Sequence, residues 1–465
     1  MVLITQPLYA AVSAVVGRKA PLYFATALFF VGSLVFGLAR SMSQVIAGRV
    51  LQGLGGSGLD VLSEIIVTDT TTIGDRSLYL GLMALPTAVG TVLGPPLGGL
   101  FSTFVTWRWI GFFNLPILGL SLLLELFFLR LTPDKALLQK RPEHLDWFGM
   151  VMFALGTTLF ALPISWAGTL YAWGSWPTIL LLSIGTIILG IFALYERRPK
   201  HPIMPARLFH SRTATMTFIG AFFHGATLFP LLQWLPLLYQ AVGLDSVLQS
   251  AITLIPACVA SVVFAVAGVA LVGVLGKGYR WCISLAWCLT TAGSGLLVLL
   301  DEHSSIALRN GVPVLWGAGV GLLLRLLFLP NQASVLRVDD TGLAIGTLLT
   351  FRLFGGLLGI ATCSSIFSGL YRNSIATIDG LPDYALPLKD PNQAIRLIHT
   401  LRTLKLPGNL LSAIQAAYLA PIRVIFYVMI GVGVLGLTSS LFLQDLDLKC
   451  TDNGERLVSE IEQAV

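Results

Sequence analysis

The stretch GTVLGPPLGG, Gly90–Gly99, places four glycines and two adjacent prolines inside one of the most apolar regions of the chain. In the interior of a soluble helix, each glycine costs about 1 kcal/mol and each proline about 3 kcal/mol. A helix that carries all six of these residues therefore needs an unusual solvent or an unusual neighbour. The rest of the sequence indicates both.

The composition predicts a polytopic membrane protein. The 465 residues are 55% hydrophobic and 11% charged, and their mean hydropathy is +0.83. A typical globular domain has about 25% charged residues, so this chain has too little charge to cover a water-soluble surface. The net charge of +6 comes from basic residues that lie between apolar blocks, which favours membrane orientation over nucleic-acid binding. The five cysteines form no CxxC pair, and packing is their expected role.

Apolar segments long enough to cross a hydrocarbon core, about 20 residues each, recur along the chain with short polar breaks. We predict twelve full spans, at residues 20–39, 44–68, 78–101, 109–129, 147–167, 177–195, 213–239, 247–275, 281–300, 312–329, 343–370 and 422–443. Met1–Val16 is apolar but about one turn short, and we interpret it as the inner end of a helix.

The polar breaks predict the orientation of the spans. If GRK, Gly17–Lys19, faces the cytoplasm, so do Asp75-Arg76, the breaks near 131–146, 196–212 and 276–280, and the C-terminal tail, and this side carries the excess of Lys and Arg. The long polar segment from Tyr371 to about Pro421 then lies outside the cell, because the number of spans requires it.

Four local patterns follow one another in a fixed order: YAAVSAVVGRK from Tyr9, RVLQGLGGSG from Arg49, GTVLGPPLGG from Gly90 and WRWIGFFNLP from Trp107. DWFG, YERRPKHPIMPARLF and FHG come later. Together they resemble the major facilitator superfamily, and specifically its fourteen-span drug/proton antiporters of fungi. The resemblance covers nearly the whole chain.

The resemblance implies an all-α polytopic membrane protein of the major facilitator fold, with two helical bundles and two extra linking helices. We expect an N-terminal bundle at 1–130, with its first helix missing and its second truncated. Cytoplasmic loops and two linking helices would follow at 131–211, a C-terminal bundle with an external loop (371–420) at 212–445, and a cytoplasmic tail at 446–465.

The opening stretch can now be interpreted physically. Gly90, Gly94 and Gly98 repeat every fourth residue, which leaves a side-chain-free strip against which another helix can pack closely. Pro95 and Pro96 release backbone carbonyls and favour a kink. Simple helix packing remains an alternative, but the resemblance identifies the stretch, through Gly99, as the antiporter motif, which lies between the bundles and is thought to bias the cycle toward export.

The span that contains Arg49 has the strongest chemical pattern. At 100° per residue, Arg49, Gly53, Asp60 and Glu64 fall within a sector of about 60°. A central charge costs about 2.5 to 3.5 kcal/mol on insertion scales, so the two acids should face water, a basic partner or substrate, or be protonated part of the time. Asp60 and Glu64 are therefore our proton-coupling candidates, with a structural ion pair as the alternative.

The resemblance also indicates a cytoplasmic gate. It comprises Gly17, Arg18, Lys19, Asp69 and Arg76. Asp69 lies at the end of its helix, on the same side of the membrane as the GRK turn, so a salt bridge can form between them. Where the family has an acid three residues before the glycine, this chain has Ala14.

Other intramembrane polar residues are candidates for charge pairing or for the cavity wall. They are Arg49, Gln52, Glu125, His224, Arg325 and Arg352. We expect Glu125 to extend toward the interface and His224 to be a hydrogen-bonded core residue. Arg325 and Arg352 are possible counterions for an acidic substrate or for an acid in the other bundle.

The pattern predicts a transporter that exports small hydrophobic or amphipathic compounds in exchange for protons. A siderophore or other metabolite carrier is the alternative within transport, and a truncated, non-transporting membrane protein is the alternative outside it. No phosphate loop, HExxH pair or GxSxG turn is present, so the sequence indicates neither an enzyme nor a cofactor or metal site. We expect a monomer in the plasma membrane, with the vacuolar membrane as the alternative.

Overall fold

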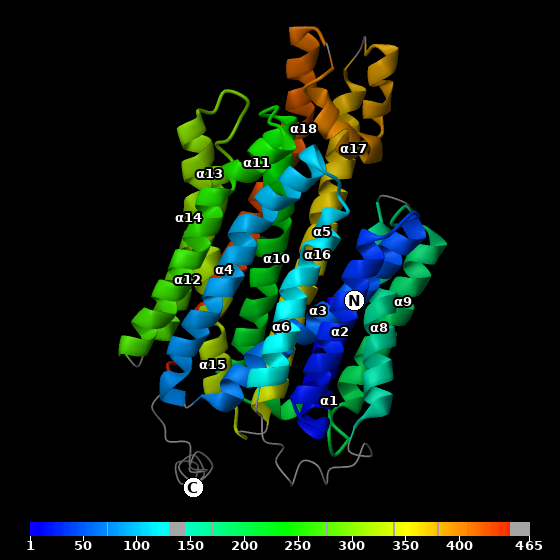
Figure 1. The fold of residues 1–465 in the computed structure, drawn as a ribbon. Helices are drawn as coiled ribbons and strands as arrows, with labels where there is room; N and C mark the ends of the chain where they lie inside the picture. The colour runs from blue at the N-terminus through cyan, green and yellow to red at the C-terminus, as the bar shows by residue number, and fades with distance from the viewer. Residues whose placement is uncertain are drawn as a thin grey trace.

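The computed structural model describes residues 1–71, 73–129, 145–168, 171–275, 278–337, 340–378, 381–404 and 406–446, without the side chains of 73–78, 80, 88 and 399–400. Within these ranges the chain is almost entirely helical, and β pairing is limited to one bridge between Ala167 and Tyr171. The long helices run side by side through the molecule (Figure 1).

The first part of the chain forms one group of helices. These are α1 (Val2–Val16), α2 (Lys19–Gly37), α3 (Met42–Thr70), α4 (Ile73–Phe104), α5 (Trp109–Phe112) and α6 (Asn114–Phe128). A pair of helices, α8 (Trp147–Trp166) and α9 (Trp176–Tyr195), and the 3₁₀ helix η2 (Ala206–Phe209) follow.

The second part forms another group. Its long helices are α10 (Arg212–Ala241), α12 (Ile255–Leu275), α13 (Tyr279–Leu297), α14 (Ile306–Leu326), α16 (Thr341–Ala376) and α18 (Gly408–Leu441). Shorter elements lie between them: α11 (Val247–Thr253), α15 (Phe328–Ala333), η4 (Asp383–Lys389) and α17 (Pro391–Leu401).

Local sequence explains where several helices begin and end. The hydroxyl groups of Ser41, Ser211 and Ser305 cap α3, α10 and α14 by accepting hydrogen bonds from backbone N–H groups of the first turn. Gly17 ends α1 with φ of +92°, a conformation that a side chain disfavours. The helix boundaries thus follow from caps as well as from hydropathy.

Eleven helices of the described ranges are long and apolar enough to cross a membrane. They correspond to eleven of the twelve predicted spans. The predicted span at 281–300 is α13, which has 19 residues but does not reach the hydropathy of the others, because arginine, serine and threonine interrupt its apolar residues. It nevertheless packs against α14 and α18 within the second bundle.

Two helical bundles form the body of the protein. In the first, α3 packs on α1 and α2; in the second, α14 packs on α12 and α13, and α10 on α16 and α18. Gly225 and Gly355 lie at the α10–α16 crossing, where an added Cβ would overlap the backbone carbonyls of Arg352 and Phe222. The bundles meet where α4 packs on α12 and α1 packs on α16.

The helices α8 and α9 pack against each other, and α8 also contacts α1 and α16. Ala11, Phe153, Phe192 and Ile203 form a small buried cluster that joins the pair to α1. Apolar side chains thus hold α8 and α9 beside α1 and α16, two helices through which the bundles contact each other.

The segment expected as a polar loop, 371–420, is largely helical, and this expectation was wrong in its extent. The helix α16 continues to Ala376 and α18 begins at Gly408, well before the predicted start at 422. The tyrosines of these extensions fix the segment between them: the Tyr371 hydroxyl donates a hydrogen bond to the Leu388 carbonyl, and the Tyr418 hydroxyl to the Ala394 carbonyl. Buried aromatic contacts outweigh the polarity on which the loop prediction rested.

Candidate functional site

The two acids of α3 have different surroundings. The Glu64 side chain is buried, whereas the Asp60 side chain is exposed although it lies in the middle of α3. An exposed acid halfway along a membrane helix faces open space inside the protein or beside it. Asp60 and Glu64 interact electrostatically with each other and with Arg325 and Arg352.

Glu64 forms an ion pair with Arg325 of α14, so the pair joins the two bundles. The Arg325 guanidinium also donates hydrogen bonds to the Met83 carbonyl oxygen at 3.1 Å and to the Thr87 hydroxyl at 2.8 Å, both on α4. A single buried guanidinium therefore connects α3, α4 and α14. Removing either charge of such a pair leaves the other unpaired in a low-dielectric interior.

Asp60 accepts a hydrogen bond from the side-chain amide of Gln6 at 2.7 Å. Within the described ranges no basic nitrogen lies within 4.0 Å of its carboxylate. Gln6 lies on α1 and is fully buried. The Asp60 carboxylate thus has a neutral partner and is free to bind a proton or a cation.

Arg352 of α16 is the fourth charged residue of this cluster. Its guanidinium donates a hydrogen bond to the Leu324 carbonyl at 3.2 Å and lies 5.3 Å from the centre of the Phe328 ring. In the part of the chain that the structure describes, no carboxylate pairs with it directly. Arg352 therefore contributes positive electrostatic potential to the cluster without forming a direct ion pair.

Arg49 does not join the acids, although it shares their helical face. Its guanidinium donates a hydrogen bond to Gln52 at 3.3 Å and lies over the Phe36 ring at 4.2 Å. Gln52 in turn donates to the Ser33 hydroxyl. Eleven residues separate Arg49 from Asp60, which is about 16 Å along a helix, so a common face does not imply contact.

Three of the residues expected to form the gate, Gly17, Arg18 and Lys19, lie where α1 ends and α2 begins, and Asp69 lies at the end of α3. The Arg18 guanidinium forms an ion pair with Asp69 at 2.8 Å and donates a hydrogen bond to the Ser13 hydroxyl at 2.7 Å. Lys19 lies 5.6 Å from the Tyr23 ring. The expected salt bridge between the GRK turn and Asp69 is thus present in the structure. The Arg76 side chain lies outside the described residues.

The glycine strip of α4 has no helix packed on it within the described residues. A Cβ added at Gly90, Gly94 or Gly98 would meet no atom within 4 Å, whereas one at Gly99 would contact Leu248 of α11. The helix continues through Pro95 and Pro96. The strip is a free surface in this structure, and its assignment as the antiporter motif stays a prediction.

Glu125 and His224 occupy packed positions. The Glu125 carboxylate, expected to extend toward the interface, instead accepts hydrogen bonds from the hydroxyls of Thr26 and Ser121. His224 is fully buried, and its Nε2 lies 3.2 Å from the Val320 carbonyl. Both residues hold helices together within a bundle.

Sequence reasoning missed Glu196, which follows α9 directly. Its carboxyl is 5% exposed and accepts a hydrogen bond from the Ile203 backbone N–H at 3.2 Å. Burial raises the pKa of Glu196 to about 7, and the nearby Asp146 carboxylate adds to this shift. The sequence places Glu196 in a basic, polar segment, which gives no signal that it is buried.

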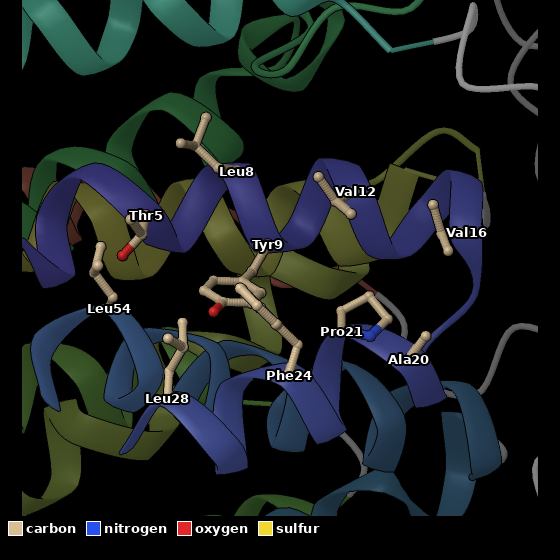
Figure 2. Close-up of a pocket in the computed structure, with 10 residues that line it drawn as sticks. All are labelled: Thr5, Leu8, Tyr9, Val12, Val16, Ala20, Pro21, Phe24, Leu28 and Leu54. Carbon is tan, nitrogen blue, oxygen red and sulfur yellow. The ribbon is translucent and has the colours of Figure 1, made fainter. Parts of the chain in front are cut away.

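An apolar groove lies between α1 and α2 (Figure 2). It has a volume of about 500 Å³, and its floor includes Leu54 of α3. Thr5 and Tyr9 carry the hydroxyls among the side chains that line it. The sequence analysis did not identify this groove, because it forms where two helices diverge.

Two bundles of membrane-spanning helices that meet around a buried inter-bundle ion pair define a polytopic transporter of the major facilitator fold. Residues 1–360 match the Major Facilitator Superfamily, and the chain belongs to this family.

The relatives of this chain carry names of transporters and efflux pumps. It is 50% identical over 461 residues to the MFS-type transporter sphD of Aspergillus fumigatus, covering 98% of this chain and 79% of the relative. It is 30% identical over 466 residues to the MFS transporter L2 of a Phoma species (99% and 77%). It is also 30% identical over 455 residues to the efflux pump FUS6 of Gibberella fujikuroi (97% and 81%).

Solved structures show the same fold. The human organic anion transporter MFSD10 (TETRAN) superimposes with a TM-score of 0.61 at 16% identity, covering 94% of this chain and 80% of that one. A bacterial homologue of the lysosomal transporter Spinster, in an inward-facing, unoccupied conformation, gives 0.54 at 15% identity (94% and 86%). The expected fold class is therefore confirmed.

Proposed function

We propose that the protein exports small amphipathic compounds, of the kind fungi make as secondary metabolites, in exchange for protons. The name of one of the three relatives reported above, the efflux pump FUS6, supports export. The other two are called MFS transporters. Exchange for protons is inferred from the charged cluster. The observation that carries this inference is the unpaired Asp60 carboxylate beside the inter-bundle Glu64–Arg325 pair.

We infer different roles for the two acids. Asp60 is exposed and has only a neutral hydrogen-bond donor, so it can exchange a proton without breaking an ion pair. Its ionised form attracts a proton or the positive end of a cargo molecule, and occupation by one excludes the other. Glu64 is buried against Arg325, so its function is to hold the bundles together in this conformation.

The Arg18–Asp69 pair complements this arrangement at the end of α3. It connects the α1–α2 turn to the last turn of α3, nine residues, or about 13 Å, along the helix from Asp60. When the bundles rock, a contact at this end must open for the central acid to reach that side of the membrane. We assign the pair to the gate, which faces the cytoplasm by the distribution of basic residues.

We further propose the fourteen-span subtype, with α8 and α9 as the two linking helices, and the domain boundaries at 130, 211 and 445. The open glycine face of α4 is suited to a further packed helix. Residence in the plasma membrane is likewise a proposal.

The decisive experiment compares Asp60→Asn with Glu64→Gln in reconstituted vesicles. A fluorescent amphipathic dye reports extrusion with and without an imposed pH gradient. We expect Asp60→Asn to remove the stimulation by the gradient, because an amide has nearly the same shape as a carboxylic acid but does not gain or lose a proton in this pH range. Asp383→Asn, on the exposed η4, is the matched control.

Two results would contradict the proposal. If Asp60→Asn retains gradient-driven extrusion equal to that of Asp383→Asn, Asp60 is not the coupling acid. If the unaltered protein extrudes dye equally with the gradient collapsed, it does not exchange its cargo for protons.

A further inference from the structure

Gln6 is a polar residue of α1 that is buried where the two bundles meet. Its side chain is fully buried, and α1 packs on α3 of the first bundle and on α16 of the second. A Cβ added at Gly346 of α16 would lie 3.8 Å from the Gln6 backbone carbonyl oxygen. The Gln6 side-chain amide contacts Asp60 of α3. Gln6 therefore lies between the second bundle and the acid to which we assign proton exchange.

The two polar atoms of the Gln6 amide differ in their partners. Nε2 donates a hydrogen bond to Oδ2 of Asp60 at 2.7 Å. Oε1 is buried, and no group in the described part of the chain donates a hydrogen bond to it. A buried carbonyl oxygen without a donor costs about 1 to 3 kcal/mol. Oε1 is therefore an acceptor that a newly formed donor beside it would satisfy.

The charged groups around Asp60 do not supply this donor. Glu64, Arg325 and Arg352, from α3, α14 and α16, act on the charge of the Asp60 carboxylate. Glu64 and Arg325 pair with each other, and Arg352 donates to a backbone carbonyl of α14. The Asp60 carboxyl is the hydrogen-bonded neighbour of the Gln6 amide, and it gains an O–H group when it binds a proton. Proton binding at Asp60 thus creates a donor next to Oε1.

A carboxylic acid and a primary amide are complementary in their hydrogen bonding. The acid O–H donates to the amide oxygen while the amide N–H donates to the other acid oxygen, so that two hydrogen bonds close a ring. An ionised carboxylate has acceptors only, so it forms the N–H bond and leaves the amide oxygen unpaired. The structure shows this one-bond arrangement for Gln6 and Asp60.

We propose that Gln6 is the positioning residue for the exchanged proton, and that its Oε1 accepts a hydrogen bond from the protonated Asp60 carboxyl. The proton comes from water on the side of the membrane to which Asp60 is open and returns to water on the other side, and only the Asp60 O–H bond forms and breaks. The paired acid presents no negative charge to a cationic cargo. This inference rests on the proposed role of Asp60 in proton exchange and adds the residue that orients the proton.

Infrared difference spectroscopy of the full-length protein in lipid tests the proposal. Spectra at acidic and alkaline pH differ by a carbonyl band for each carboxyl group that binds a proton, and the part of this band that is missing from Asp60→Asn belongs to Asp60. Hydrogen bonds lower the wavenumber of such a band.

We expect the Asp60 band to move to higher wavenumber in Gln6→Met. Methionine has nearly the length of glutamine but lacks the N–H donor and the carbonyl acceptor. Gln415→Met on α18 is the matched control, because it also removes an amide that donates a hydrogen bond at 2.7 Å, to the Val242 carbonyl far along the chain from Asp60. It should leave the band in place, and a role of Gln6 in packing alone would not move the band.

Dye extrusion by reconstituted vesicles gives a second measurement. Gln6→Lys should lose the stimulation by the pH gradient as completely as Asp60→Asn does. The ammonium group donates to the carboxylate and pairs with its charge, but it has no acceptor for the O–H of the protonated acid. Gln415→Lys, the control, should keep the stimulation.

An Asp60 band at the same wavenumber in Gln6→Met and Gln415→Met would overturn the role of Gln6 and leave proton exchange by Asp60 intact. If the unaltered protein has no band that Asp60→Asn removes, Asp60 binds no proton, and the proposed coupling fails together with this inference. If Gln6→Met does not give a monodisperse protein, Gln6→Lys decides: stimulation equal to that of Gln415→Lys would contradict the assignment.

Discussion

At the scale of single residues, Asp60 and Glu64 show that two acids on one helix can have different partners because of their positions along it. They are about one turn apart on α3. Glu64 points at a guanidinium from the other bundle, whereas Asp60 meets only an amide. Coulomb interactions are strong in a low-dielectric interior, and this difference in partners is the reason why we propose Asp60, and not Glu64, as the acid that exchanges a proton.

Glu196 gives a prediction at the same scale. Its folded-state pKa is about 7, above the ordinary value of 4.5, because it is buried. The folded protein therefore holds this proton more tightly than the unfolded chain does, so the contribution of Glu196 to stability falls as pH rises from about 4.5 to about 7. Glu196→Gln keeps an acceptor for the Ile203 N–H and removes this loss of stability at higher pH, because the amide does not ionise.

Thermal unfolding in detergent at pH 4.5 and pH 8 checks the prediction. The unfolding temperature of Glu196→Gln should exceed that of the unaltered protein at pH 8 and equal it near pH 4.5. The exposed Asp383→Asn should show no such difference. A Glu196→Gln protein that is less stable at pH 8 would contradict the assigned cause.

At the scale of elements, small residues determine how closely helices approach. The α10–α16 crossing brings backbone against backbone at Gly225 and Gly355, whereas α4 presents Gly90, Gly94 and Gly98 to open space. Helices in a membrane associate by close packing and gain little from the hydrophobic effect. A glycine therefore contributes to stability where the backbone of another helix contacts it.

We predict that Gly355→Ala destabilises the protein by about 1 to 3 kcal/mol, since its Cβ would overlap the Phe222 carbonyl. Gly431→Ala on α18 is the matched control, because an added Cβ there meets no atom within 4 Å. It should be neutral or stabilising by up to about 1 kcal/mol. Unfolding temperatures in detergent measure both, and equal effects would show that the crossing tolerates a Cβ.

At the scale of the whole molecule, the two bundles touch through few charged contacts. Within the described residues, the Glu64–Arg325 ion pair connects them, as do the α1–α16 and α4–α12 helix contacts. Removing one partner of a buried ion pair lowers the folding stability more than removing both partners does. This asymmetry provides a test of the connection.

Glu64→Gln and Arg325→Gln should each lower stability by about 3 to 5 kcal/mol. The double variant should cost less than the sum of the two, because neither charge is then left unpaired. A double-mutant cycle from unfolding measurements gives the coupling. Additivity of the single effects would mean that the pair does not connect the bundles.

The sequence by itself determined that the chain crosses a membrane many times, and it located eleven spans. It could do so because a hydrocarbon core requires about 20 apolar residues and internally satisfied backbone groups, which are local properties. It failed where packing extends a helix into a polar segment, as at the start of α18.

The candidate site was predictable only as a set of residues. Asp60, Glu64, Arg325 and Arg352 stood out because charges inside a membrane are costly, but the sequence did not show which of them pair. Glu64 and Arg325 are 261 positions apart, and Arg49 shares a face with Glu64 without reaching it. The tertiary structure alone decided these partners, because an ion pair depends on a few ångströms of separation that only the packing of distant helices sets.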